Sequence, residues 1–267
     1  MGPASACHRG GMEPDQWHGN GKGLSPSCRC RGKLADMPCS CGVMKHWADI
    51  EDVRQRVRIA LARKGVAYEE KPENLAAKSA LLLSSNPVHG QVPVLLVGGK
   101  PVCESLVILE FIDEEFAGVG EPLLPAGPYE RAQARFWASY IDAKLAPCAG
   151  RVWRSPAGAA GAAAVEAARG ELVAAMRTLE AELGGRRYFG GGGEALGYVD
   201  VALAPFTAWF ATYERFGGFS VAAECPELAA WAARCVRENA CVAASLPDPE
   251  FVYQFACGMR KHFGLDG

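Results

Sequence analysis

The sequence predicts an α+β domain followed by an all-helical domain. Up to residue 117 the apolar residues switch between helical and strand spacing, whereas from residue 129 onward the spacing is almost entirely helical. Between the two parts, residues 118–128 contain Pro122 and Pro125, which indicates a linker. With 267 residues, 49% of them hydrophobic, the chain can hold one large or two small domains around a sizeable core.

Residues 1–45 are rich in Gly, Pro, Ser, Cys and His and show no periodic pattern, so we expect a disordered extension. Cys28-Arg29-Cys30 and Cys39-Ser40-Cys41 lie in this segment. Structural zinc sites usually place two to four residues between paired cysteines, so we expect no metal here. The odd total of 11 cysteines does not suggest a secreted disulfide framework.

The domain at residues 46–117 has a helix–strand–helix–strand–strand–helix order. The expected elements are a helix from Asp52 to Gly65, a strand at 66–68, a helix at 76–83, a strand at 92–97, a hairpin turn at Gly98-Gly99 and a helix at 105–116. The only candidate for a preceding strand is Gly42-Val43-Met44. Provided that this strand forms, the order predicts a thioredoxin-like sandwich.

The second domain, residues 129–267, is predicted to be a bundle of helices. They are expected at 129–145, 161–183, 198–216, 226–238 and 247–263, and the helix at 198–216 is apolar on all sides. Asp200 stands three residues after Gly197, where a carboxylate reaches back to the free amides of a helix start. We therefore interpret Asp200 as a structural residue.

Bulk properties exclude several function classes. The formal net charge of −2 argues against a nucleic acid or a membrane surface as a partner. No apolar run reaches the roughly 18 residues that a membrane span needs, and the N-terminus lacks the apolar core of a secretory signal. We expect a cytoplasmic protein.

The stretch from Asn86 to Leu95, with Glu104-Ser105 after it, indicates a binding surface for a small charged peptide. Pro93 stands before an apolar run and cannot donate to a sheet ladder, which leaves the backbone of Val92 open to pair with an extended ligand. Ser105 sits where a helix begins, and its neighbouring amides favour a carboxylate, while Glu104 can hold an ammonium group. These two residues can therefore bind both the carboxylate and the ammonium group of one amino acid in a ligand.

In order and spacing, several segments resemble plant glutathione transferases of the tau class, from about Arg56 to Gly264. They are Arg56-Val57-Arg58-Ile59-Ala60-Leu61, Lys64-Gly65-Val66, Lys78-Ser79, the stretch just described, Arg135-Phe136-Trp137-Ala138, Tyr188-Phe189-Gly190-Gly191 and Leu196-Gly197-Tyr198-Val199-Asp200. The resemblance implies the glutathione transferase fold and a homodimer. It also implies that glutathione is a co-substrate, not a bound cofactor, and that its thiol is conjugated to small apolar electrophiles. The alternative is a catalytically impaired protein that binds glutathione or apolar ligands.

The resemblance assigns ligand contacts to individual residues. Glu104 and Ser105 take the γ-glutamyl end of glutathione, Val92 pairs with the cysteinyl backbone, and Lys78 with Gln91 takes the glycyl carboxylate. The family usually has Lys at the positions of Gly90 and Gln91, and the neutral replacement weakens binding. The second-substrate site falls to Trp153, Trp209 and Tyr213.

The family's catalytic serine, at the start of the first helix, has no counterpart here. An ungapped comparison puts Glu51 at that position, and a two-residue shift puts Asp49 there. A free thiol with a pKa of about 8.5 is mostly protonated at pH 7, so the loss of the activating hydroxyl predicts impaired activity. A third hypothesis is thiol transfer through Cys39 or Cys41. It is weaker because neither cysteine stands just before the first helix, which starts about ten residues later.

Overall fold

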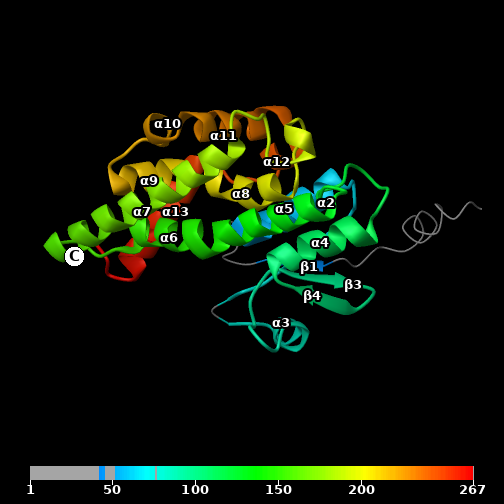
Figure 1. Cartoon of the computed structure of the whole chain (residues 1–267). Coiled ribbons are helices and arrows are strands. Elements are labelled where there is room, and N and C mark those ends of the chain that lie inside the picture. The colour runs from blue at the N-terminus through cyan, green and yellow to red at the C-terminus, as the bar shows by residue number, and fades with distance from the viewer. Residues whose placement is uncertain (1–41, 46–51, 76, 267) are drawn as a thin grey trace, which may run out of the picture. The chain divides into compact units, whose positions relative to one another are not determined.

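The computed structural model describes residues 42–45, 52–75 and 77–266 (Figure 1). The first domain contains β1 (Gly42–Lys45), α2 (Asp52–Arg63), β2 (Glu69–Pro72), α3 (Ala80–Ser85), β3 (Val94–Val97), β4 (Lys100–Cys103) and α4 (Ser105–Glu115). The second contains α5 (Pro128–Tyr140), the π-helical turn η3 (Ile141–Leu145), α6 (Ala146–Arg154), α7 (Ala159–Leu183), the 3-10 turn η4 (Gly191–Gly193), α8 (Tyr198–Thr207), α9 (Phe210–Gly217), α10 (Val221–Glu224), α11 (Pro226–Glu238), α12 (Ala240–Ala243) and α13 (Pro249–His262).

The four described strands form one mixed sheet in the order β2-β1-β3-β4. β1 runs parallel to β2 and antiparallel to β3, which pairs antiparallel with β4. The predicted first strand is confirmed, and with it the thioredoxin-like fold class. The sheet begins at Gly42, within the segment that the sequence analysis assigned to the extension. β1 has no clear apolar pattern in the sequence and is defined by its pairing with β2 and β3.

Each face of the sheet has its own helical cover, set by the alternation of side chains along β3. Val94 and Leu96 belong to a small cluster with Leu82 of α3. Leu95 and Val97 belong to the main core, which also contains the buried residues of α2 and α4. Figure 1 shows α3 on one side of the strands and α4 on the other.

Two expected elements of this domain lie a few residues later than predicted. The strand expected at 66–68 forms at 69–72: Val66 is buried in the main core, but the backbone that pairs with β1 starts at Glu69. The helix expected at 76–83 starts at Ala80, since Ser79 caps it by accepting a hydrogen bond from the backbone N–H of Leu82 at 3.1 Å.

The linker is tied to the first domain by Asp113 at the end of α4. Its carboxylate accepts hydrogen bonds from the backbone N–H groups of Leu123 (2.9 Å) and Leu124 (3.0 Å) and pairs with Lys64 at 2.8 Å. Burial alone would raise the pKa of Asp113, but the contacts with Lys64 and the two amides outweigh it and the pKa is lowered.

Two helices of the second domain differ from their predicted extents. The helix expected to end at Leu145 continues through η3 into α6, where the wider turn accommodates the missing N–H of Pro147. The helix expected at 198–216 splits into α8 and α9, because the N–H of Trp209 bonds to the third residue back, Phe206, and tightens the chain. None of the described helices is long and apolar enough to cross a bilayer.

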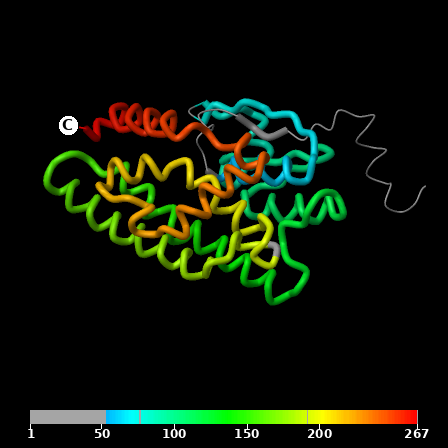
Figure 2. The backbone as a smooth tube through the Cα atoms, turned by 90° about the horizontal axis from the view of Figure 1, so that it is seen from above, coloured from blue at the N-terminus to red at the C-terminus, as the bar shows by residue number. Residues whose placement is uncertain are grey.

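Asp200 has the structural role predicted for it. Its buried carboxylate accepts hydrogen bonds from the backbone N–H groups of Phe189, Gly190 and Gly197 and from Nε1 of Trp231, at 2.8–3.0 Å. It thereby joins η4's loop, the start of α8 and α11. Figure 2 shows the helical domain from above, with α13 in red along one side.

Candidate functional site

A pocket of ≈ 460 Å³ opens where the first domain meets η3. Four places in the chain line it: the start of α2, the loop between α3 and β3, the junction of β4 with α4, and η3. The lining residues are Val53, Asn86, His89, Gln91, Val92, Pro93, Glu104, Ser105 and Asp142. Four residues predicted from sequence as ligand contacts (Gln91, Val92, Glu104, Ser105) are thus brought together in one pocket.

Asn86 holds the loop between α3 and β3 in shape. Its side-chain Nδ2 donates to the carbonyl of Gln91 at 3.0 Å, and its Oδ1 accepts from the backbone N–H of His89 at 3.1 Å. The Val92–Pro93 peptide is cis. β3 starts at Val94, and no backbone hydrogen bond joins Val92 to another described residue, although Val92 is only 7% exposed.

Glu104 has an unusual backbone for a residue with a side chain. Its φ is 69°, in the left-handed region, which costs of order 1–3 kcal/mol and clusters at functional positions. It is the N-cap residue of α4, yet its carboxylate makes no capping hydrogen bond. The side chain is 62% exposed, with Oε1 3.7 Å from Nε2 of His89 across the pocket mouth. The carboxylate is therefore available to a cationic group.

Arg56 of α2 joins three parts of the site, although its side chain is fully buried. Nη1 donates to Ser105 Oγ at 3.1 Å, Nη2 donates to Asp142 Oδ1 at 2.6 Å, and Nε donates to the carbonyl of Ala202 in α8 at 2.8 Å. The guanidinium also lies over the ring of Phe206, 5.7 Å from its centre. Arg56 thus ties Ser105 of the first domain to Asp142 and α8 of the helical domain.

Known proteins similar to this chain identify its family. Residues 42–114 match the glutathione S-transferase N-terminal domain and residues 162–234 the C-terminal domain. The chain is 52% identical over 222 residues to a rice protein described as probable glutathione S-transferase GSTU1, covering 79% of this chain and 92% of the relative. A crystal structure of mango MiGSTU, described as a tau-class glutathione S-transferase, aligns with a TM-score of 0.73 at 37% identity, covering 81% of this chain and 97% of that one. The chain belongs to the tau class of glutathione S-transferases.

Two further proteins with glutathione S-transferase names are similar to this chain. Glutathione S-transferase U24 of Arabidopsis thaliana is 47% identical over 224 residues, covering 84% of this chain and 97% of the relative. The crystal structure of rice GST1 (OsGSTU1) in complex with glutathione aligns with a TM-score of 0.78 at 48% identity, covering 85% of this chain and 99% of that one.

Lys78 lies beside the pocket but does not line it. Its exposed side chain reaches Gly90, where Nζ lies 3.5 Å from the position that a Cβ on that glycine would take. The described lining residues include the carboxylates of Glu104 and Asp142 and no Lys or Arg. Lys78 is therefore the ammonium group next to the loop at Gly90-Gln91.

Trp153, Trp209 and Tyr213 lie together but away from this pocket. The rings of Trp153 and Trp209 stack at 5.5 Å and those of Trp209 and Tyr213 at 6.1 Å. All three are buried in the main core, with at most 6% exposed, and none lines the pocket that contains Glu104. The described structure gives them packing contacts and no open surface for a second substrate.

The expected catalytic position lies outside the described residues. Glu51 and Asp49 precede α2, and Cys39 and Cys41 precede β1. Among described cysteines, Cys103 directly precedes Glu104, and burial followed by the charge of Glu104 raises its pKa, so it is protonated at neutral pH. Groups of three or more His, Cys, Asp or Glu side chains suited to a metal do not occur among the described residues.

Sequence analysis placed Asn86 and His89 in the binding stretch without giving either a role, and it missed Arg56 and Asp142. Arg56 sits next to Val57 on a helix that seemed to need only an apolar face. The one available signal was a charged residue among the apolar positions of α2, a charge that must be paired if it is buried.

Proposed function

We propose that the pocket between Glu104 and Gln91 binds glutathione and that the chain conjugates its thiol to small apolar electrophiles. The observation that carries the proposal is Glu104, which has a left-handed backbone, makes no capping hydrogen bond and lines the pocket. A carboxylate there can hold the γ-glutamyl ammonium, and the first amides of α4 beside Ser105 can hold the neighbouring carboxylate. The glutathione in the rice relative's structure supports this ligand.

The rest of glutathione would extend along the loop toward Gly90. The open backbone of Val92 can pair with the cysteinyl residue in the manner of an added strand. The glycyl carboxylate would then meet the neutral amide of Gln91 and the ammonium of Lys78 beside Gly90. Since a neutral hydrogen bond is about half as strong as a charge-assisted one, Gln91 contributes less than a cation would.

The alternative function, a protein that binds glutathione without efficient conjugation, is favoured by the charges around the pocket. Glu104 and Asp142 line it, and by the family resemblance the acid Glu51 replaces the serine that activates the thiol. Like charges disfavour the thiolate on which conjugation depends. Binding and chemistry therefore need separate measurements.

Calorimetric titration of glutathione into the parent and the Glu104→Ala and Glu104→Gln variants tests the site. We expect Glu104→Ala to weaken binding by about 1.5 to 3 kcal/mol, the scale of a charged hydrogen bond, and Glu104→Gln to fall between. The control is Glu115→Ala, which removes an exposed carboxylate at the other end of α4. Equal affinities in all four proteins would reject the assigned site, whereas binding without turnover of a chlorinated nitrobenzene would select the alternative function.

We also propose a homodimer through the outer faces of α4 and α5. Val107 is 54% exposed and Phe136 57% exposed, and Arg135 holds the two helices together by donating to Glu110 at 2.6 Å. Sedimentation should give twice the chain's mass for the parent and a monomer for Phe136→Glu. A dimer that survives this change would place the interface elsewhere.

For this function we further propose a cytoplasmic location and no requirement for a metal or a bound cofactor. Fluorescence of a tagged chain in plant cells tests the location. Turnover that is unchanged after treatment with a chelator and dialysis supports the absence of a cofactor, whereas lost turnover restored by a metal would contradict it.

A further inference from the structure

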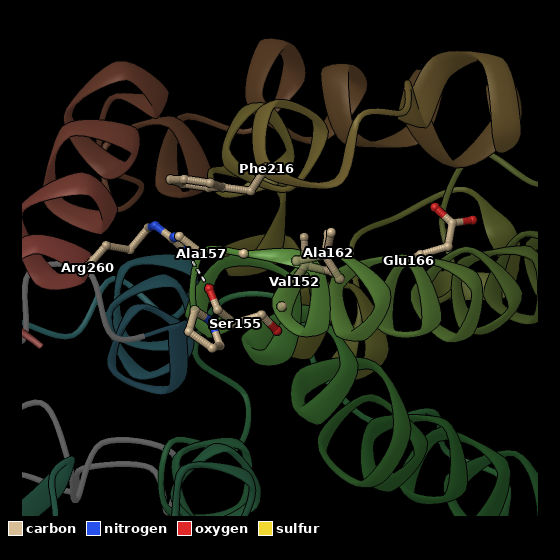
Figure 3. Close-up of a pocket in the computed structure, with 11 residues that line it drawn as sticks. Val152, Ser155, Ala157, Ala162, Glu166, Phe216 and Arg260 are labelled. Carbon is tan, nitrogen blue, oxygen red and sulfur yellow. Dashed lines mark hydrogen bonds between the residues drawn. The ribbon is translucent and has the colours of Figure 1, made fainter. Parts of the chain in front are cut away.

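The hollow between α6, α7, α9 and α13 uses its charged side chain within the protein (Figure 3). Arg260 is the cation among its described lining residues, and it pairs with Asp266 at 2.6 Å. Nη1 of Arg260 also donates to the carbonyls of Trp153 and Ser155, at 2.7 and 2.8 Å. The pocket at Glu104 differs from this hollow, because it presents side chains that the protein itself does not use.

The two ends of the pocket at Glu104 differ in charge. One end presents the Glu104 carboxylate, whose side chain is 62% exposed. The other end presents the neutral amide of Gln91. The described lining residues include no Lys or Arg, and the carboxylate of Asp142 is already paired with Arg56 at 2.6 Å. A ligand with a charge at each end is therefore matched by an opposite charge at Glu104 but not at Gln91.

Gln91 is held by its backbone and not by its side chain. Its carbonyl accepts a hydrogen bond from Asn86 Nδ2 at 3.0 Å, whereas no hydrogen bond ties its side-chain amide to another described residue. An amide donates and accepts, so it can pair with a carboxylate or with a second amide. A site rejects an analogue strongly only when buried polar groups are left unpaired, and the side chain of Gln91 is exposed to water. Gln91 therefore discriminates little between these two partners.

Lys78 does not supply the missing contact inside the pocket. Its Nζ lies 3.5 Å and its Cδ 3.8 Å from the position that a Cβ on Gly90 would take, and it is not a lining residue. The side chain is exposed and forms no ion pair with another described residue. The attraction between exposed charges is weak because water screens it. Lys78 can therefore attract a carboxylate from outside the pocket without making recognition depend on one.

We propose that the pocket accepts glutathione with a neutral C-terminal group as readily as glutathione itself. The substrate class is the C-terminal amides of γ-glutamylcysteinylglycine, which include peptides that continue beyond the glycine. This inference rests on the proposed glutathione function and adds that recognition depends on the γ-glutamyl end. A C-terminal amide can both donate to and accept from Gln91, and it brings no second negative charge into a pocket that Glu104 and Asp142 line.

Titration calorimetry of the full chain with glutathione and with glutathione amide tests the proposal. The two ligands have the same shape and differ by one charge at the C-terminus. We expect their dissociation constants to lie within about threefold of each other. Glutathione with an acetylated amino group loses the ammonium that Glu104 would hold, and it should bind at least about tenfold more weakly than either ligand.

Gln91→Lys is the variant that should create selectivity. Position 91 is exposed and does not have a positive φ, so it can carry a lysine, whereas Gly90 has a φ of 57° that strains any other residue. We expect Gln91→Lys to tighten glutathione binding about threefold to tenfold and to change the affinity for glutathione amide less than about twofold. The matched control is Ala62→Lys, which adds the same charge at an exposed position in the last turn of α2 and should change neither affinity.

The outcomes separate this inference from the function on which it rests. A parent protein that binds glutathione more than about threefold tighter than the amide would overturn the inference, as would a Gln91→Lys variant that keeps the parent's ratio of affinities. Undiminished binding of the acetylated ligand would also overturn it. In these three cases glutathione still binds, so the proposed function stands. Absence of binding by both glutathione and its amide would reject the glutathione pocket and this inference together.

Discussion

Asp142→Ala removes the carboxylate partner of the buried Arg56 guanidinium. The change deletes contacts of 2.6 and 3.2 Å and leaves Arg56 with Ser105 Oγ and the carbonyl of Ala202. Breaking a buried ion pair by removing one partner costs about 3–5 kcal/mol of unfolding free energy. Because the Asp142 side chain is 41% exposed, water can reach the space that it leaves, so we expect a loss of about 2 to 3 kcal/mol.

A matched surface pair provides the control. Arg177 donates from Nη2 to Glu224 at 2.5 Å, a similar distance, but the two side chains are 61% and 35% exposed. Glu224→Ala should therefore cost less than about 1 kcal/mol. Urea denaturation at one protein concentration measures both changes, with the denaturant slope checked for constancy.

The same variant should affect the pocket. With Asp142 gone, Arg56 is no longer held from two sides, and Ser105 loses a firmly oriented partner. Glutathione affinity should therefore fall in Asp142→Ala and stay unchanged in Glu224→Ala. If the two variants lost the same stability within about 0.5 kcal/mol, or if both kept full glutathione affinity, the assigned role of Arg56 would be refuted.

Three further predictions concern other parts of the chain. Glu51→Ser should raise the rate of conjugation to a chlorinated nitrobenzene about a hundredfold with glutathione affinity little changed, since it removes a like charge and restores a hydroxyl donor to the thiolate; equal rates would mean that another residue activates the thiol. Removal of residues 1–41 should leave the melting temperature unchanged, whereas removal of residues 1–45 also deletes β1 from the interior of the sheet and should abolish the cooperative transition; equal melting of both truncations would contradict the sheet order. The lowered pKa of Asp113 means that its contribution to stability is present above the ordinary aspartate value of 3.8 and is lost as the pH falls through the lowered value. Asp113→Asn should therefore flatten the dependence of unfolding free energy on pH below about pH 4, and an unchanged slope in acid denaturation would refute this.

Local patterns predicted the elements whose chemistry is local. Gly98-Gly99 forms the predicted hairpin turn with φ values of 56° and 79°, α11 spans Pro226–Glu238 as predicted, and Asp200 binds the amides expected of it. These features depend on turn preference, a proline at a helix start and a carboxylate at a fixed spacing. The glutathione transferase fold and the cluster of Gln91, Val92, Glu104 and Ser105 also followed from the order of the segments.

Long-range contacts were beyond the sequence patterns. Arg56 and Asp142 are 86 residues apart, and nothing near either one indicates its partner. The aromatic spacing at Trp153 and Trp209 fits a cleft or a core equally well, and only the packing of α6 against α9 selects the core. Tertiary context decided each of these cases.

The two ends of the pocket proposed to bind glutathione are supported by very different amounts of buried structure. Ser105 is tied through Arg56 to the main core, whereas the loop at Gln91 rests on the small cluster of Leu82, Val92 and Val94. Local opening takes the least free energy where few apolar contacts must be broken, so amide hydrogens from Ser79 to Val92 should exchange with solvent much faster than those of α4. A ligand that spans both ends would meet a rigid partner at Ser105 and would have to order the loop at Gln91. The entropy cost of ordering that loop would reduce the binding free energy gained from the glycyl half of glutathione. Residues that rigidify α3 could therefore raise glutathione affinity without touching the ligand.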